Sequence, residues 1–237
     1  MHYILNIETS GNACSVALSG NNKLIAFKEN NAGKLHASLL SPFIDDVLRE
    51  GNISPRALSA IAVSKGPGSY TGLRIGVSTA KGLAYALNIP IIGINTLESL
   101  TYGFLNKYRK YSGKKDIILC PMIDARRMEV YTCLFSPELK IIKDITAEII
   151  REDSFDTFLR EKTIVFFGEG ALKCKPVINH ENAIFIDFTN LSARFMVDLS
   201  IKACNLGNFE NTAYFEPFYL KDFIAGKPGR DILRKEK

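Results

Sequence analysis

The sequence predicts an α/β protein in which short strands alternate with amphipathic helices. A buried-type run at Ile61–Val63, a helix from about Ser69 to Leu87 and a second apolar run at Pro90–Ile94 form a strand–helix–strand unit. Such a unit implies a right-handed parallel crossover. Three β-prone runs before it read as hairpins, and sheet-forming runs recur in the second half. We therefore expect sheets flanked by helices in both halves.

The first 28 residues predict a hairpin meander of strands at His2–Glu8, Ala13–Leu18 and Lys23–Lys28. Gly11-Asn12 and Gly20-Asn21-Asn22 separate these runs, and both are turn sequences. The first turn places an acidic group, two hydroxyls and free backbone N–H groups at the end of a strand, which is a pattern that can cradle a phosphate. Three small polar residues before a hairpin are also found in plain turns, so both interpretations stay open.

Leu35–Glu50 predicts a helix whose apolar residues cover about 180° of its surface. A surface helix needs only about 100° to meet its own core, so the excess hints at a second contact surface. Pro42 either kinks one long helix, or Ser41 caps a shorter one. His36 falls within the apolar arc, where a structural or interface histidine is expected.

Ser64–Leu87 is the stretch around which we expect the chain to be organised. Gly66, Pro67 and Gly68 predict a loop, and hydroxyl residues from Ser69 to Thr71 can cap the helix that follows. Small residues then recur every fourth position and align in one row along that helix: Gly72, Gly76, Ala80 and Ala84. A row without large side chains lets another backbone come close. The pattern leaves open whether a partner helix or the protein's own sheet lies there.

The rest of the chain continues the α/β pattern after a helix at Thr96–Tyr108, for which Thr96 is the expected cap. A polar, basic stretch follows at Tyr108–Lys115, and we place a domain boundary there. Strands are predicted at Asp116–Ile123, Glu129–Phe135, Leu139–Ile145, Thr163–Phe167 and Ala183–Phe188, and helices at Asp153–Arg160 and Ser192–Leu206. Gly168-Glu169-Gly170-Ala171 lies between a strand and a helix, which makes it a candidate edge for a phosphate or nucleoside.

Composition is that of an ordinary globular protein of 237 residues with a net charge of +5. There is no apolar run of membrane-spanning length and no signal-like start, so a cytoplasmic protein is expected. The five cysteines are scattered, which predicts reduced, mostly buried thiols, and the three histidines have no metal-binding spacing. Residues 221–237 hold six basic and three acidic residues. That tail either touches RNA phosphates or is simply solvated.

Four segments together resemble one known family. They are KGPGSYTGLRIG at Lys65–Gly76, IETSG at Ile7–Gly11, DARRMEVY at Asp124–Tyr131 and EPFYLKD at Glu216–Asp222. The chain resembles the bacterial TsaB (YeaZ) proteins over nearly its whole length. The resemblance implies a two-lobed actin-like, ribonuclease-H-like (ASKHA) fold with mixed sheets and a reduced second lobe. It also implies the role of dimerisation subunit in the complex that makes threonylcarbamoyladenosine in tRNA.

Three segments are expected on this basis. Residues 1–108 would form the first lobe and carry the dimerisation helices, and residues 109–212 the reduced second lobe. Residues 213–237 would form a C-terminal segment that packs back on the first lobe and ends in the basic tail.

The resemblance also implies partners and an absence of chemistry. TsaD would pair with the two apolar helices, TsaE would join the pair, TsaC-type proteins would supply the threonylcarbamoyl-adenylate, tRNA would be met through the complex, and the isolated chain would form homodimers. TsaD carries two metal-binding histidines in a segment matched here by Ile94–Ser99, which has none. No catalytic residue, metal or cofactor is therefore expected.

The implied partner interface combines the row of small residues with apolar and polar neighbours from both helices. Its members are His36, Leu39, Leu40, Phe43, Val47, Gly72, Leu73, Arg74, Gly76, Val77, Ala80, Leu83 and Ala84. Leucine at Gly76 or Ala80 is expected to overpack that contact and block the partner.

Two rival functions remain. An ATP-binding phosphotransferase of the acetate and sugar kinase–actin superfamily would bind ATP through Thr9, Ser10, Gly168 and Gly170, with Glu8 as its acidic group. A peptidase is the third reading, but no Ser or Cys has an evident pairing with a histidine and a carboxylate.

Overall fold

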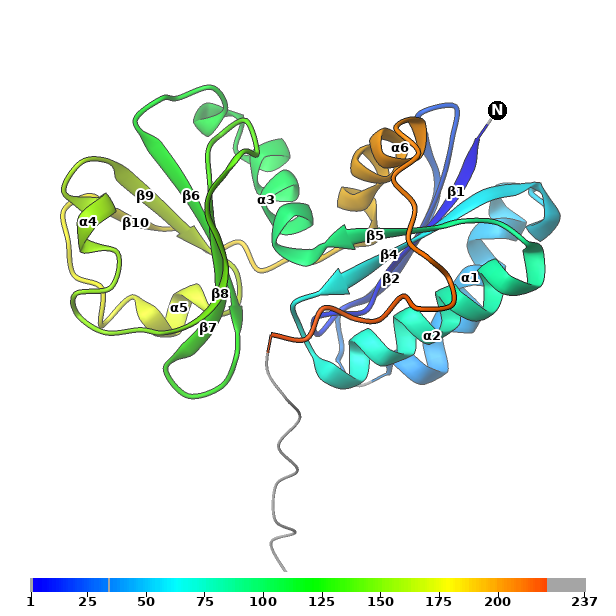
Figure 1. Ribbon diagram of the computed structural model, residues 1–237, viewed down its shortest axis with the longest axis horizontal. Coiled ribbons are helices and arrows are strands. Elements are labelled where there is room, and N and C mark those ends of the chain that lie inside the picture. The colour runs from blue at the N-terminus through cyan, green and yellow to red at the C-terminus, as the bar shows by residue number, and fades with distance from the viewer. Residues whose placement is uncertain (1, 34, 221–237) are drawn as a thin grey trace, which may run out of the picture.

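The computed structural model describes residues 2–33 and 35–220, and it contains two five-stranded sheets side by side (Figure 1). Sheet A has the order β3-β2-β1-β4-β5. Its strands are β1 (Tyr3–Glu8), β2 (Cys14–Gly20), β3 (Lys23–Asn30), β4 (Leu58–Gly66) and β5 (Ile91–Asn95). The first three pair antiparallel, and β1, β4 and β5 pair parallel. The predicted meander and crossover are confirmed.

Sheet B repeats this topology with different residues. Its strands are β6 (Ile117–Asp124), β7 (Glu129–Phe135), β8 (Ile141–Ile149), β9 (Thr163–Phe167) and β10 (Ala183–Phe185). Their order is β10-β9-β6-β7-β8. The pairs β6–β7 and β7–β8 are antiparallel, and the pairs β6–β9 and β9–β10 are parallel. Each strand of sheet B thus has a counterpart in sheet A. The predicted class, a two-lobed α/β fold with mixed sheets flanked by helices, is confirmed.

Helices cover both faces of sheet A. The longer ones are α1 (His36–Glu50), α2 (Tyr70–Leu87), α3 (Thr96–Lys107) and α6 (Val197–Asn205), with short turns α4 (Asp156–Leu159) and α5 (Ala171–Cys174) and 3-10 turns at Pro55–Ala57, Arg109–Tyr111 and Ala193–Met196. Leu5 and Ile7 of β1 point to the core under α1 and α2, while Ile4 points to the core under α6. This alternation is the period-two pattern of a strand that is buried on both faces.

Two helices each pack against the sheet that is formed by the other half of the chain: α3 packs on sheet B, and α6 packs on sheet A. Leu97, Leu100 and Phe104 of α3 belong to the core cluster of sheet B, where the Phe104 and Phe167 rings stack with centroids 4.1 Å apart. Met196 and Val197 belong to the core of sheet A. These contacts join the two halves through an exchange of helices. The predicted segment boundaries after residues 108 and 212 stay predictions.

Local details of three helices settle what the sequence predicted or left open. Pro42 lies inside a single helix α1, which runs on through it. The cap of α3 is Asn95, whose side chain accepts from the N–H groups of Leu97 and Glu98, so the expectation of Thr96 was wrong. Ser69 caps α2 as expected and accepts from the Gly72 N–H at 3.3 Å.

The cysteines follow the prediction of buried thiols. All five are free, and all but the half-buried Cys204 are buried. Burial raises the pKa of Cys14 and of Cys174 to about 11, so these thiols stay protonated at neutral pH.

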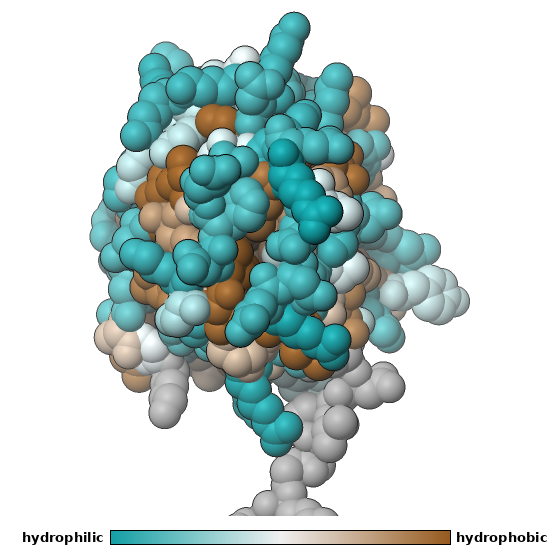
Figure 2. All heavy atoms as spheres, turned by 90° about the vertical axis from the view of Figure 1, so that its left-hand side faces the viewer, coloured by the Kyte–Doolittle hydropathy of each residue, from teal (hydrophilic) through white to brown (hydrophobic). Residues whose placement is uncertain are grey.

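Figure 2 views the end of the molecule that carries α4 and β10, where hydrophobic side chains lie in separate areas among hydrophilic ones.

Residues 206–220, which we call the C-terminal strap, run along the edge of sheet A and over α2 (Figure 1). The Glu210 N–H donates to Ile91 O at 2.9 Å, and the Phe218 N–H donates to Lys65 O at 2.6 Å. The buried Phe215 joins the core under α2. The basic tail at 221–237 lies outside the described residues.

Lys81 of α2 fastens the strap, because its ammonium donates to Ala213 O at 3.1 Å and to Phe215 O at 2.9 Å. Lys81→Met keeps the aliphatic stem and removes both charge-assisted bonds, so we expect the free energy of unfolding to fall by about 1.5–3 kcal/mol. Urea denaturation measures this loss, and Lys140→Met, at an exposed lysine, is the control. Equal stability of the two variants would contradict the role of Lys81.

Candidate functional site

The turn after β1 holds the start of α2. Thr9 and Ser10 are buried, and the Thr9 hydroxyl donates to Gly72 O at 2.8 Å. The Ser69 N–H donates to Ser10 O at 2.7 Å. The Thr9 hydroxyl and the Ser10 carbonyl of this turn thus form hydrogen bonds with the first residues of a helix that begins more than fifty positions further along the chain. The turn is thus a docking point for α2, and phosphate binding by its backbone N–H groups stays a prediction.

Glu8, at the end of β1, is fully buried. Its Oε1 accepts from the Ser10 N–H at 2.6 Å and from the Ser10 hydroxyl at 2.5 Å. The Ser64 hydroxyl beside it bonds Thr96 Oγ1 at 2.7 Å. Burial raises the pKa of Glu8, and the bonds from Ser10 oppose that shift without cancelling it.

The pH dependence of the stability of a Glu8→Gln variant tests whether the pKa of Glu8 is raised in the folded protein. A carboxyl whose folded pKa is raised loses its contribution to stability as the pH rises above its unfolded value, which is ordinarily 4.5. The glutamine oxygen can still accept both Ser10 bonds. We therefore expect equal stability at acid pH and an advantage for Glu8→Gln that grows above pH 4.5. Urea denaturation across this range measures it, with exposed Glu181→Gln as the control for loss of one charge; a constant difference would contradict the prediction.

The row of small residues on α2 faces the protein's own sheet. A Cβ added to Gly72 would lie closer than 3.0 Å to Thr9 O, and one added to Gly76 closer than 3.0 Å to Thr9 Oγ1. Ala80 and Ala84 belong to the core between α2 and sheet A. The interpretation of this row as a seam for a partner helix is wrong. Leucine at Gly76 or Ala80 would test the folding of this chain and not a partner interface.

The other residues of the predicted interface divide by burial. Leu40, Val47, Leu73 and Val77 are buried under the helices, as is the small-residue row. His36, Leu39, Phe43 and Leu83 are half-buried, and Arg74 is exposed. His36 Nε2 lies 3.0 Å from Gly11 O and 3.2 Å from Ala13 O, so this histidine ties α1 to the turn after β1.

The outer face of α1 and α2 combines four residues of the predicted interface with four others. We use this name for Leu39, Phe43, Arg74, Ser78, Gly82, Leu83, Tyr85 and Ala86. Tyr85 is 85% exposed, and an added Cβ at Gly82 would meet nothing within 4 Å. Ser78, Gly82 and Ala86 recur every fourth position on the side opposite the buried row. The sequence held this signal, but only burial shows which of the two rows faces outward.

The glycines after β9 serve the packing of sheet B. Gly168 has φ +102° and lies against the backbone of Met122, and the Gly170 N–H donates to Met122 O at 2.9 Å. Glu169 accepts from Asn12 Nδ2 at 3.0 Å, which links this turn to the turn after β1. Thr9, Ser10, Gly168 and Gly170 all make contacts within the chain, and the Asn12–Glu169 bond joins the two turns that hold them; nucleotide binding by these residues stays a prediction.

Two like-ordered mixed sheets, joined by exchanged helices, define a two-lobed α/β protein whose first turn anchors a helix. A family model described as TsaD, tRNA N6-adenosine threonylcarbamoyltransferase, matches residues 29–193. The tRNA threonylcarbamoyladenosine biosynthesis protein TsaB of Escherichia coli (strain K12) is 37% identical over 96% of this chain and 99% of its own length. That of Bacillus subtilis (strain 168) is 36% identical over 74% of both chains. The chain belongs to the TsaB family.

A solved structure agrees with this assignment. YeaZ from Pseudomonas aeruginosa superposes with a TM-score of 0.79 at 25% identity, over 93% of this chain and all of that one. The expected resemblance to TsaB (YeaZ) proteins is thus confirmed. In the described part of the chain, no helix is long and apolar enough to cross a membrane.

Proposed function

We propose that this chain is a non-catalytic subunit required for threonylcarbamoyl transfer to N6 of the adenosine beside the anticodon in tRNA. One observation carries the proposal: the Thr9 hydroxyl, in the turn that would otherwise receive a phosphate, is bonded to Gly72 O and fully buried. The turn therefore fixes α2 and, with it, the outer face. A chain built in this way presents a surface and does not hold a reacting group.

The segment Ile94–Ser99 supports the same conclusion. The resemblance implies that TsaD carries two metal-binding histidines in the matching segment. In this chain the segment contains no histidine and forms the beginning of α3. Asn95 caps the helix, and the Thr96 hydroxyl is buried against Ser64. Among residues 2–33 and 35–220, no three His, Cys, Asp or Glu side chains gather where they could hold a metal ion.

The partner we propose is TsaD, bound through the outer face of α1 and α2. Leu39, Phe43 and Leu83 pack against the core and stay half-buried, so part of their apolar area is open on the face that also holds the small residues Ser78 and Gly82. Small residues let two helices approach closely, and apolar residues around them supply the area that drives association. TsaE would join this pair, tRNA would be met through the complex, and the same face would form a homodimer in the isolated chain.

The phosphotransferase has no such support, because Thr9 and Ser10 are buried and engaged, and the two glycines lie against Met122 and Val130. The test is reconstitution with purified TsaD, TsaE and a TsaC-type protein, with threonylcarbamoyladenosine in tRNA measured by mass spectrometry of nucleosides. We expect modification only when this chain and TsaD are both present. Modification by this chain without TsaD, or by TsaD without this chain, would overturn the proposal.

A further inference from the structure

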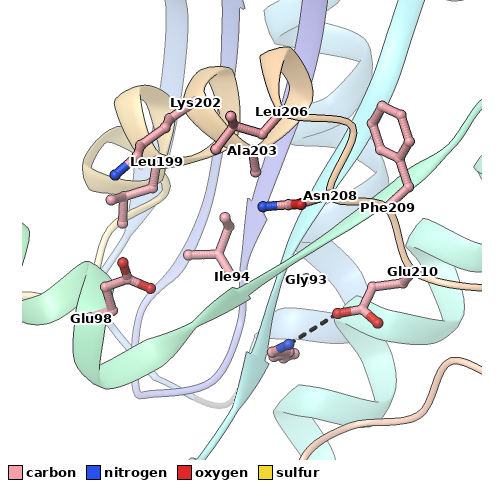
Figure 3. Close-up of a pocket in the computed structure, with 11 residues that line it drawn as sticks. Gly93, Ile94, Glu98, Leu199, Lys202, Ala203, Leu206, Asn208, Phe209 and Glu210 are labelled. Atoms are coloured by element: carbon pink, nitrogen blue, oxygen red, sulfur yellow. Dashed lines mark hydrogen bonds and ion pairs between the residues drawn. The ribbon is translucent and has the colours of Figure 1, made fainter. Parts of the chain in front are cut away.

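A pocket of about 560 Å³ lies at the edge of sheet A, away from the outer face of α1 and α2 (Figure 3). Its walls come from β5, the first turn of α3, helix α6 and the C-terminal strap. Ile94, Leu199 and Ala203 form an apolar side, and the Asn208 amide points into the space over Ile94. The volume is within the range of small-molecule sites.

The charged groups of this pocket are not all paired. Lys65 and Glu210 form an ion pair at 3.0 Å, marked by the dashed line in Figure 3. The Glu98 carboxylate and the Lys202 ammonium lie at the other end of the pocket and form no ion pair with each other. Within the described ranges, neither has a hydrogen bond or ion pair with any side chain. Burial raises the pKa of Glu98, and the charge of Lys202 opposes that shift.

We propose that this pocket binds a free α-amino acid, with its ammonium at Glu98 and its carboxylate at Lys202 and the Asn208 amide. A zwitterion supplies one charge of each sign and so matches the two unpaired groups. An anion alone would approach the Glu98 carboxylate, and a cation alone would approach the Lys202 ammonium, each at a cost in repulsion. A short side chain that ends in a methyl group, such as that of threonine, would place this methyl group against Ile94, Leu199 and Ala203.

The open edge of β5 adds a backbone contribution. Ile91 O on this edge accepts from Glu210, in a single bridge between the strap and the strand. Backbone groups two residues apart on a strand face the same edge, so those of Gly93 face the pocket beyond the bridge. An added Cβ at Gly93 would lie 2.5 Å from Glu210 Oε1, so glycine also leaves room for the Lys65–Glu210 pair. A bound amino acid could therefore hydrogen bond to the main chain as well.

Calorimetric titration of the full chain tests the proposal with L-threonine, N-acetyl-L-threonine and L-threoninamide. Threonine is the first probe because the proposed function concerns threonylcarbamoyl transfer. The match between a zwitterion and the charges of Glu98 and Lys202 does not depend on that function. We expect threonine to bind and each derivative, which lacks one of the two charges, to bind about tenfold to a hundredfold more weakly. Absence of threonine binding at millimolar concentration, or equal binding of the derivatives, would overturn the proposal.

Two variants locate the site. Glu98→Gln and Lys202→Met should each weaken threonine binding about tenfold or more, while exposed Lys175→Met leaves it unchanged. Thermal unfolding of each variant checks that its fold is intact. Unchanged binding in both pocket variants would overturn the assignment of this pocket. Because the tRNA assay above does not measure this binding, failure here would leave the proposed function standing, and the reverse also holds.

Discussion

Gly72→Ala is expected to destabilise the protein by about 3 kcal/mol or more, although alanine is the better helix former by about 1 kcal/mol. The reason is the backbone of Thr9, because an added Cβ would lie against its carbonyl oxygen at a distance that real Cβ atoms essentially never show. A main-chain atom cannot move aside by rotating a side chain. The helix or the turn must shift, and the bond from the Thr9 hydroxyl to Gly72 O is strained or lost.

Two glycines of the same helix provide graded controls. Gly76→Ala meets the Thr9 side chain and not its main chain, so we expect a smaller loss of stability. Gly82→Ala meets nothing within 4 Å and should stabilise the chain by about 0.5–1 kcal/mol. Urea denaturation of the three variants measures the series. A Gly72→Ala protein as stable as the unchanged chain would show that α2 does not pack on the turn in solution.

The same helix shows how far the sequence could go. The sequence predicted α2, a hydroxyl cap between Ser69 and Thr71 and a row of small residues suited to a close approach, and all three are present. It could not say which backbone comes close, because periodicity defines a face of a helix and not its neighbour. The neighbour, Thr9, is bonded to Gly72 across 63 positions of the chain. The buried row was therefore open to two interpretations until the contact itself was known.

Contacts between distant segments account for the other features that the sequence did not predict. Each strand run was visible, but the common order of the two sheets was not, because no sequence repeat accompanies it. The exchange of α3 and α6 depends on which sheet each apolar face meets, and both sheets offer similar apolar surfaces. Likewise Glu98, Lys202 and Asn208 come from different elements and meet only in the fold. A local pattern cannot signal such a group.

Gly82→Trp is expected to abolish pairing with TsaD while leaving this chain folded, with an increase in the dissociation constant of about a hundredfold or more. Gly82 lies on the exposed side of α2, where an added Cβ meets nothing within 4 Å. Packed helices lie about 8–10 Å apart, so an indole at the contact would hold the partner helix away. Apolar area from Leu39 and Phe43 would then stay in water.

Binding of purified TsaD, measured by calorimetry or analytical ultracentrifugation, checks this expectation, with thermal unfolding as the measure of the fold. Leu172→Trp is the matched control, since Leu172 is half exposed on α5, which packs on sheet B and not on the outer face. Loss of pairing in Gly82→Trp but not in Leu172→Trp places the partner on α2. If Gly82→Trp binds TsaD as tightly as the unchanged chain, the outer face of α1 and α2 is not the contact, because no partner helix could pack over residue 82 without meeting the indole.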